Sequence, residues 1–350
     1  MYLGLDIGRQ FVKGVVIDKH KHDTRIVKTG IRLVPEQHRA FDPDQITKPH
    51  RVMAVQELMK EMKINPKKVR NLVTSISGTN ISVKQITTMD MPTDELVSSM
   101  TFEARKHIPM DGSDAVIDFQ IFGPNPKEVD KIDIGLVACT KRVSTNHIDM
   151  LKEIGLKPGI IDADPIALTN AFTSGHDLTE DGAVVLLDIG SLSSSLVVWG
   201  RKDRYFTRDI PIGSHQFVTA LAEKLDKGYL ESQDDIMKNG VECFKDESSA
   251  EIGNITVADR TVFDNLIEDV RRSLRYYAKT TNQSYFIKIF LSGGGAETKG
   301  LAELIESKLN LETMVLNPFH SITEHDNLDI SNKSQFSVAV GLAIRGYLSE

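Results

Sequence analysis

The hydrophobic pattern begins with two short apolar runs on either side of a tight polar turn. The first run ends on Asp6-Ile7-Gly8, and a second β-rich run continues through Val15, Val16 and Ile17. Two strands joined by a glycine-containing turn predict a β-hairpin. The carboxylate at the mouth of this turn is the kind of group that a magnesium–nucleotide site needs.

Strand and helix patterns then alternate along the rest of the chain, which predicts an α/β protein. Apolar or alternating runs predict strands at 24–34, 71–76, 81–89, 115–122, 132–140, 183–199 (a second hairpin), 205–210, 286–291 and 314–316. Apolar residues at helical spacing predict helices at 52–62, 93–108, 148–154, 164–172, 213–225, 262–277, 301–308 and 336–347. Residues 35–49 have the composition of a surface connection, and residues 226–255 are polar and irregular, with a weak helix at 231–237.

The two predicted hairpins match each other. A shift of 182 residues places Leu5-Asp6-Ile7-Gly8 over Leu187-Asp188-Ile189-Gly190, and Val15-Val16-Ile17 over Val197-Val198-Trp199. One match at this distance indicates two related lobes and not a solenoid, whose period would be much shorter. The alternative is coincidence, because Asp-x-Gly turns after strands are common.

Composition and charge narrow the function classes. The 350 residues suggest two domain-sized units, and the net charge of −7 argues against general nucleic-acid binding. The two cysteines, Cys139 and Cys243, have no CxxC spacing, which favours a reduced intracellular chain. No signal peptide and no apolar stretch long enough to span a bilayer is present in the sequence, so a soluble cytosolic protein is expected.

Two hairpins facing each other across a cleft predict a polyphosphate site. The turn amides of 8–11 and 190–193 would donate to phosphate oxygens, and Asp6 and Asp188 would hold hydrated Mg²⁺. Lys13 is a candidate phosphate contact, with a solvated strand lysine as the alternative.

Three further groups are candidates for the same cleft. Gly293, Gly294 and Gly295 follow a strand and would allow close backbone approach to a ligand, although glycines are also ordinary strand-to-helix connectors. Asp164 starts a predicted helix, where capping is the favoured interpretation and positioning of a metal-bound water the alternative. Glu268 and Arg272 lie four residues apart and so share one helix face. The favoured interpretation is an ion pair within the helix, and the alternative is that both side chains lie beside a bound nucleoside.

Taken in order, these residues resemble the actin, Hsp70 and sugar-kinase superfamily of ATPases. Asp6-Ile-Gly looks like the first phosphate loop, Asp164-Pro the connecting element, Asp188-Ile-Gly the second phosphate loop, and Ser292-Gly-Gly-Gly the adenosine loop. The resemblance implies ribonuclease H-like lobes, ATP and Mg²⁺ as ligands, and Asp164 and Asp188 as catalytic residues.

Longer strings resemble the PilM family, actin-like cytoplasmic proteins of type IV pilus assembly. They cover nearly the whole chain and include Phe206-Thr-Arg-Asp-Ile-Pro-Ile-Gly213, Arg272-Ser-Leu-Arg-Tyr-Tyr277, Asn317-Pro-Phe319, Val338-Ala-Val-Gly-Leu-Ala-Ile-Arg345, and Glu103-Ala-Arg-Lys-His-Ile-Pro109 with Asp118. The last string is similar to the inserted subdomain of PilM and FtsA. The implied division is lobe one at 1–82 and 159–181, an inserted subdomain at 83–158, lobe two at 182–225 and 285–350, and a smaller subdomain at 226–284.

The first loop departs from the family pattern, which is usually rich in serine after the glycine. Here it reads Arg9-Gln10-Phe11, so hydroxyl contacts to phosphate are lost, while Arg9 and Gln10 remain candidate contacts. The second loop keeps Ser191, Ser193 and Ser194. We therefore expect nucleotide binding with slow or absent hydrolysis.

The resemblance also implies a partner and a location. The expected partner is the cytoplasmic N-terminal tail of the inner-membrane protein PilN, held in a groove between lobe one and the inserted subdomain. Contacts with other pilus inner-membrane components or motor ATPases would follow, and the protein would reach the membrane only through partners. An FtsA-like filament protein and a small-molecule kinase of the same superfamily are the alternatives.

Overall fold

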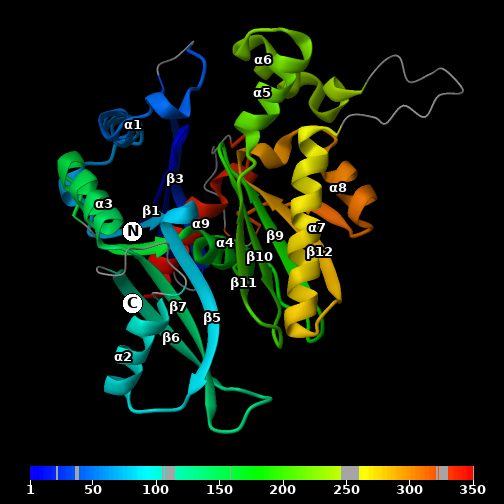
Figure 1. The fold of residues 1–350 in the computed structure, drawn as a ribbon. Helices are drawn as coiled ribbons and strands as arrows, with labels where there is room; N and C mark the ends of the chain where they lie inside the picture. The colour runs from blue at the N-terminus through cyan, green and yellow to red at the C-terminus, as the bar shows by residue number, and fades with distance from the viewer. Residues whose placement is uncertain are drawn as a thin grey trace, which may run out of the picture.

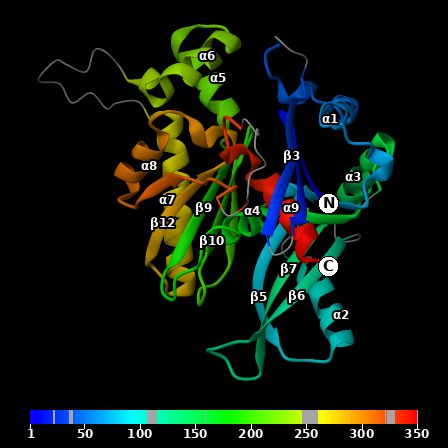
Figure 2. The same cartoon turned by 180° about the vertical axis from the view of Figure 1, so that it is seen from behind.

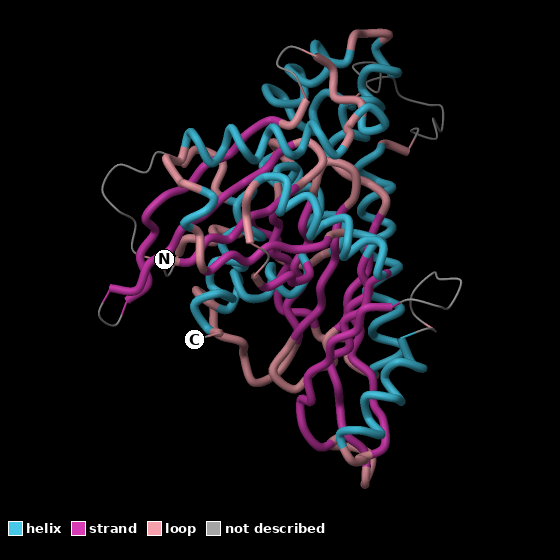
Figure 3. Tube along the Cα trace, turned by 90° about the vertical axis from the view of Figure 1, so that its left-hand side faces the viewer, coloured by secondary structure: helices cyan, strands magenta, loops and turns pink. Residues whose placement is uncertain are grey.

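The computed structural model describes residues 1–20, 23–35, 39–104, 106, 115–157, 159–245, 260–320, 322 and 330–349. Two lobes stand side by side, and a smaller subdomain projects below the first of them (Figures 1 and 2). Strands run through the middle of the body and continue into the projecting subdomain, with helices mostly outside them (Figure 3).

Lobe one is built on a five-stranded sheet in the order β3-β2-β1-β4-β8. Its first three strands are antiparallel, whereas β4 and β8 run parallel to β1. The strands are β1 (Tyr2–Ile7), β2 (Phe11–His20), β3 (Asp23–Leu33), β4 (Asn71–Ile76) and β8 (Ile160–Ala163). Apolar side chains on one sheet face pack against α1 (Lys48–Glu61) and α3 (Lys141–Ile154), and those on the other against α4 (Asp164–Thr173) and α9 (Ser337–Leu348).

Lobe two repeats this topology with the order β11-β10-β9-β12-β13. As in lobe one, the first three strands along the chain, β9, β10 and β11, pair antiparallel, and β12 and β13 run parallel to β9. The strands are β9 (Ala183–Ile189), β10 (Ser194–Trp199), β11 (Phe206–Ile210), β12 (Phe286–Ser292) and β13 (Thr313–Val315). Its helices are α5 (Ser214–Leu225), α6 (Tyr229–Asn239), α7 (Val262–Thr281) and α8 (Leu301–Leu309).

The internal repeat is therefore structural and not a coincidence of short strings. Both hairpin turns are closed by the same bond, since the Gly8 amide donates to Phe11 O at 3.1 Å and the Gly190 amide donates to Ser193 O at 3.1 Å. These two pairs are related by the shift of 182 residues found in the sequence.

The inserted subdomain is a three-stranded antiparallel sheet in the order β5-β7-β6. It comprises β5 (Ile81–Met89), β6 (Ala115–Pro124), β7 (Lys131–Thr140) and α2 (Thr93–Ala104). The division expected from the sequence, 83–158, also included α3, but the apolar side chains of α3 lie in the core of lobe one with α1. Leu96, Met100 and Ala104 of α2 pack against β7 in a small separate core. The end predicted for this helix, at Ile108 and Pro109, lies outside the described residues.

Six short 3-10 turns complete the described elements. They are η1 (Pro43–Gln45), η2 (Pro66–Lys68), η3 (Gly78–Asn80), η4 (Gly240–Phe244), η5 (Gly294–Glu297) and η6 (Ser334–Phe336). In the part of the chain that the structure describes, no helix is both long enough and apolar enough to cross a membrane.

The C-terminal helix corrects the division expected from the sequence, which grouped residues 285–350 with lobe two. Helix α9 packs instead on lobe one, against α4 and β1. Glycines permit this contact, because a Cβ on Gly4 would lie 2.1 Å from Ala339 O, and one on Gly341 would lie 1.7 Å from Ala167 O. Both termini consequently lie on lobe one (Figure 1).

Helix α7 corrects the same division. The sequence placed it in a small subdomain at 226–284, but its apolar face belongs to the main core of lobe two. Phe263, Leu266, Val270 and Tyr277 pack there with the buried side chains of β9 and β12. An amphipathic pattern shows that a helix has a buried face but does not say which sheet covers it.

Candidate functional site

A cavity of about 880 Å³ lies between the two lobes. Both hairpin turns, the glycine turn after β12 and the 77–80 turn between β4 and β5 line it. The candidate side chains from distant parts of the sequence meet here because the equivalent ends of the two related sheets face each other.

Lys13 and Asp6 form an ion pair at the edge of this cavity. They are opposite each other in the β1–β2 register, and Lys13 Nζ lies 2.9 Å from Asp6 Oδ2. Their side chains are only 15% and 12% exposed, so Lys13 is not a solvated strand lysine. Burial alone would lower the pKa of Lys13, but the Asp6 carboxylate and its hydrogen bond, with Asp188 and Asp164, raise it above its usual value.

Asp188 occupies the equivalent position in lobe two. Ser292 Oγ, at the end of β12, donates to Asp188 Oδ1 at 2.8 Å. Burial raises the pKa of Asp188, and the Ser292 hydrogen bond and Lys13 partly oppose that rise. Gly293 has a φ of 85°, and a Cβ there would lie 2.5 Å from Ile189 O, so the turn that delivers Ser292 requires glycine at this position.

Asp164 is the third carboxylate of the cavity. It is the first residue of α4, but the N-cap is Ala163, and no side-chain capping bond is present there. The capping interpretation is therefore wrong. The Asp164 carboxylate instead accepts a hydrogen bond from Ser75 Oγ at 2.5 Å, and burial followed by the charge of Asp6 raises its pKa well above the usual value.

This arrangement places three carboxylates around one lysine, with Asp6 buried and Asp164 and Asp188 half-buried. Lys13 neutralises Asp6 directly, which leaves Asp164 and Asp188 with raised pKa values and one serine donor each. Among the described residues, no group of three or more His, Cys, Asp or Glu side chains is placed to hold a metal ion alone. Two carboxylates at one cavity nevertheless fit Mg²⁺, which keeps several waters and needs only one or two protein carboxylates.

The turns offer fewer free amides than the sequence suggests. The amides of Gly8 and Gly190 close their own hairpins and are not available to a phosphate.

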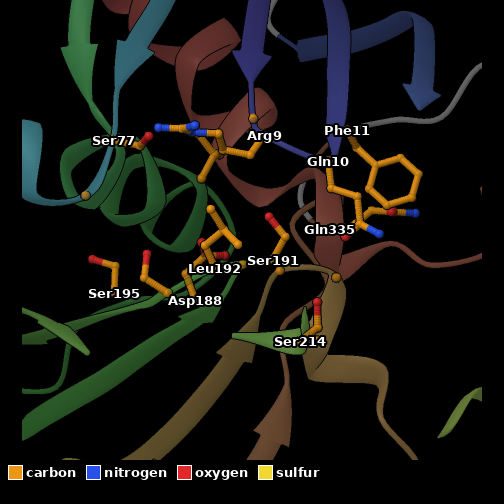
Figure 4. Close-up of a pocket in the computed structure, with 18 of the residues that line it drawn as sticks. Arg9, Gln10, Phe11, Ser77, Asp188, Ser191, Leu192, Ser195, Ser214 and Gln335 are labelled. Atoms are coloured by element: carbon orange, nitrogen blue, oxygen red, sulfur yellow. The ribbon is translucent and has the colours of Figure 1, made fainter. Parts of the chain in front are cut away.

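The unusual first loop is divided between the cavity wall and its rim. The Gln10 side chain is buried, whereas Arg9 is exposed and extends toward Ser77 on the β4–β5 turn (Figure 4). Ser191 and Asp188 lie on the opposite wall, contributed by lobe two. Arg9 therefore places its charge at the lobe-one rim and not over the 190–193 turn of lobe two.

The structure brings thirteen of the fifteen predicted site residues into this cavity and leaves two outside. The thirteen are Asp6, Gly8, Arg9, Gln10, Lys13, Asp164, Asp188, Gly190, Ser191, Ser193, Gly293, Gly294 and Gly295. Glu268 and Arg272 are absent from its lining, and each forms an ion pair within α7, Glu268 with Arg271 and Arg272 with Asp269. Both residues form ion pairs within the helix, as the favoured interpretation expected, but they do not pair with each other.

The sequence assigned no role to two serines that bind cavity carboxylates. Ser75 is the residue before the last of β4 and Ser292 is the last residue of β12, so position near a strand end was the available signal for both. The residues of the wall formed by α5, α6 and the 332–335 turn belong to no motif that the sequence offered. Its members are Ser214, Tyr229, Gln233, Ile236, Met237, Asn332 and Gln335.

The lobes also meet beside the cavity through aromatic rings. Phe41 of lobe one packs edge-on against His215 of α5, with 5.2 Å between ring centroids. Tyr229, which lines the cavity, lies 3.1 Å from His215 Nδ1 through its hydroxyl. The two lobes are thus in contact beside the interlobe cavity.

Two sheets of one topology, related turns that meet in an interlobe cavity and a carboxylate in each turn define an actin-like ATPase fold. Solved structures agree on the fold. A structure described as the PilM-PilN type IV pilus biogenesis complex matches with a TM-score of 0.81 and 23% identity, covering 99% of this chain and 98% of that one. The ethanolamine utilization protein EutJ from Carboxydothermus hydrogenoformans matches with a TM-score of 0.56 and 13% identity, covering 98% and 89%. MreB 5 of Spiroplasma citri bound to AMPPNP matches with a TM-score of 0.52 and 12% identity, covering 99% and 96%.

The family follows from the sequence match. Residues 4–347 match the family described as Type IV pilus assembly protein PilM. The chain therefore belongs to the PilM family.

Proposed function

We propose that the interlobe cavity binds a magnesium–adenine nucleotide. The observation that carries this proposal is the convergence of two repeat-related turns on one cavity, each turn with an aspartate at the end of the strand before it, Asp6 buried and Asp188 half-buried. MreB 5 of Spiroplasma citri, which shares the fold, is bound to AMPPNP in its structure. The 880 Å³ cavity is within the size range of ligand pockets.

Asp188 and Asp164 would hold Mg²⁺ through its waters, and Lys13 would contact a phosphate while it neutralises Asp6. Magnesium would supply charge neutralisation at the phosphates. We expect hydrolysis to be slow or absent, because the first loop, Arg9-Gln10-Phe11, has no hydroxyl group and Arg9 extends toward Ser77 at the rim of the cavity.

We further propose that the nucleotide-loaded protein docks the cytoplasmic tail of PilN, as a cytoplasmic component of the pilus assembly platform. The structural relative with the TM-score of 0.81 is described as a PilM-PilN complex, which supports this partner. A second cavity of about 1190 Å³ fits the expected groove, since its walls come from the inserted sheet and from β8 and α4 of lobe one. The 199–205 turn of lobe two closes its third side.

The second cavity has the mixed lining that suits an extended peptide. Phe122, Val137 and Trp199 offer apolar surface. Asp162, which is 9% exposed, and Asn170 each present a buried side-chain atom without a hydrogen-bond partner in the described structure. A peptide that brings its own donors and acceptors would satisfy these atoms.

Nucleotide binding is tested by thermal unfolding with and without Mg-ATP. A ligand selective for the folded state stabilises it by about 2.7 kcal/mol at 100 times its Kd. At about 2.1 cal/mol/K per residue over 350 residues, this corresponds to a rise in Tm of about 4 °C. An unchanged Tm at saturating Mg-ATP in a folded sample would refute the nucleotide site.

Docking is tested by calorimetric titration with a synthetic peptide of the PilN tail from the same genome. A peptide of the same composition in scrambled order is the control. Binding of the native order alone supports the proposal, and an absence of heat for both peptides contradicts it.

A further inference from the structure

Two arginines of lobe one lie close together at the rim of the interlobe cavity. Arg9 belongs to the first hairpin turn and is exposed, whereas Arg51 lies near the start of α1 and is half-buried. Burial and then the positive charge of Arg9 lower the pKa of Arg51, so the two guanidinium groups are close enough to repel each other. Among the described residues, no ion pair and no side-chain hydrogen bond reaches either guanidinium group.

The Arg51 guanidinium group also carries a buried donor that the described structure does not satisfy. Its Nε atom is shielded from solvent and has no hydrogen-bond partner within the described part of the chain. Most buried donors in native proteins are paired, because an unpaired one loses its water without gaining a partner. A negatively charged acceptor beside Arg51 would supply that partner and would offset the repulsion from Arg9.

His147 and Ser77 add neutral hydrogen-bonding groups at the same place. His147 lies on α3, and its Nε2 is 3.2 Å from the hydroxyl oxygen of Thr74 on β4, the strand that Ser77 follows. Burial and then the charge of Arg51 lower the pKa of His147 to about 4, so its imidazole is neutral at pH 7. Ser77 is exposed, and the Arg9 side chain extends toward it (Figure 4). We call Arg9, Arg51, Ser77 and His147 the rim cluster.

The rim cluster opens into the interlobe cavity but differs in charge from the carboxylate group around Lys13. Arg9 and Ser77 line the cavity, and a Cβ on the neighbouring Gly78 would meet no atom within 4 Å, so there is open space beside this turn. No carboxylate is among the groups that shift the pKa of Arg51 or His147. An anion near Lys13 would meet three carboxylates, whereas an anion at the rim cluster would meet two cations.

The chemistry of the rim cluster fits a phosphate group. Arginine presents a planar fork of donors that matches phosphate oxygens, and two arginines balance the charge of a dianion. A serine hydroxyl and a neutral imidazole offer further hydrogen bonds. The chain as a whole is acidic, with a net charge of −7, so a general excess of positive charge does not explain two adjacent arginines without acidic partners in the described structure.

We propose that the rim cluster binds a phosphate group, at a subsite separate from Lys13 and the carboxylates of the proposed nucleotide site. Arg9 and Arg51 contact the phosphate oxygens, and the bound group gives Arg51 Nε its partner. Free inorganic phosphate and the terminal phosphate of a nucleotide share this chemistry. The inference goes beyond the proposed function, because free phosphate can occupy the subsite whether or not a nucleotide binds.

The variant that isolates the rim cluster is Arg51→Met, because Arg51 is not part of the lining of the interlobe cavity. Methionine keeps an apolar stem and removes the charge and the donors. Arg70→Met is the matched control, since Arg70 is an exposed arginine of lobe one that precedes β4, at the end of the strand away from Ser77. In phosphate-free buffer Arg51→Met should be at least as stable as the wild type, because it removes a like-charge repulsion. A clearly lower Tm than that of Arg70→Met would give Arg51 a structural role and overturn the proposal.

The assay is thermal unfolding of the nucleotide-free protein with increasing inorganic phosphate, at an ionic strength held constant with sodium chloride. Phosphate also stabilises folded proteins generally, but this effect acts on all variants alike, so Arg51→Met supplies the baseline. At ten times the Kd of phosphate, we expect the Tm of the wild type and of Arg70→Met to rise about 2 °C more than that of Arg51→Met. No rise in the wild type, or an equal rise in Arg51→Met, overturns the proposal.

A second titration distinguishes the two sources of the phosphate group. The wild type is titrated with phosphate in saturating Mg-ADP and in saturating Mg-AMPPNP. If Mg-AMPPNP alone abolishes the rise in Tm, the terminal phosphate of the nucleotide occupies the rim cluster, and if the rise persists with both, free phosphate does. Loss of the rise with Mg-ADP would mean that phosphate binds at the nucleotide turns, which overturns a separate subsite. If neither nucleotide binds, the proposed nucleotide function fails, and the first titration still decides the rim cluster.

Discussion

Lys13 in the interlobe cavity gives the most demanding prediction. Lys13 holds Asp6 at 2.9 Å, and both side chains are almost fully buried. Lys13→Met keeps the length of the chain but removes the charge, leaving Asp6 without its partner beside Asp164 and Asp188. Removing one member of a buried ion pair costs about 3–5 kcal/mol.

The magnitude can be compared with an exposed pair in the same molecule. For 350 residues, a loss of 3–5 kcal/mol lowers Tm by about 4–7 °C. Lys48→Met is the matched control, because Lys48 pairs with Glu153 at 2.7 Å while the two side chains are 42% and 50% exposed. An exposed pair contributes about 0–1 kcal/mol, so this variant should lose about 1 °C or less.

The loss in Lys13→Met should depend on pH with a definite sign. Lys13 lowers the pKa values of Asp164 and Asp188, both already raised by burial, so its removal raises them further. A carboxyl with a raised pKa in the folded state keeps a proton that the unfolded chain has lost, so stability falls as pH rises from its unfolded toward its folded pKa. The deficit relative to the wild type should be smaller at about pH 5 than at about pH 8.

The assay is thermal unfolding of the wild type, the two variants and the double variant Asp6→Asn with Lys13→Met. The double variant should be more stable than Lys13→Met alone, because it removes the carboxylate that has lost its partner. A loss in Lys13→Met no larger than that in Lys48→Met, or a deficit that does not change with pH, would refute the assigned electrostatics.

Three further outcomes follow from the structure. Asp188→Asn should leave the apo protein folded, because it removes a half-buried charge whose pKa is raised by burial, and it should weaken Mg-ATP binding at least 10-fold by titration, because it removes a carboxylate of the proposed magnesium site; unchanged affinity would contradict its site role. Glu268→Gln should leave nucleotide affinity unchanged, because Glu268 lies outside the cavity, and a large loss would mean that the adenosine site is misassigned. Gly341→Ala should destabilise by about 1–3 kcal/mol despite better helix propensity, because its Cβ would lie 1.7 Å from Ala167 O. Gly346→Ala on the same helix, with 3.0 Å to the nearest atom, should cost clearly less in the same unfolding assay.

The structure contains the two hairpin turns on which the resemblance to the PilM family partly rests. The sequence predicted both turns, their shift of 182 residues and the aspartate in each, because strand periodicity and turn glycines are local features of the chain. These features were sufficient for the class of fold and for most residues of the candidate site.

Helix packing was not decided by the sequence alone. The apolar pattern predicted the C-terminal helix, yet its place on lobe one depends on the close approach that Gly4 and Gly341 allow to neighbouring backbone. The hydrophobic face of a helix can be buried on either sheet. The fit between the helix surface and the sheet surface decides which sheet the helix packs against.

The roles of charged side chains were likewise set by tertiary contacts. Asp164 has the local sequence of a helix cap, but Ser75, 89 residues earlier in the chain, holds its carboxylate at the cavity. Lys13 has the spacing of a solvated strand lysine, but in the packed structure it is largely buried beside Asp6, and the charge of Asp188 from the opposite lobe acts on its pKa. Local sequence thus determined which elements form and which residue types they carry, whereas burial and long-range neighbours, which fix the pKa and the partner of each charge, came only from the packed structure.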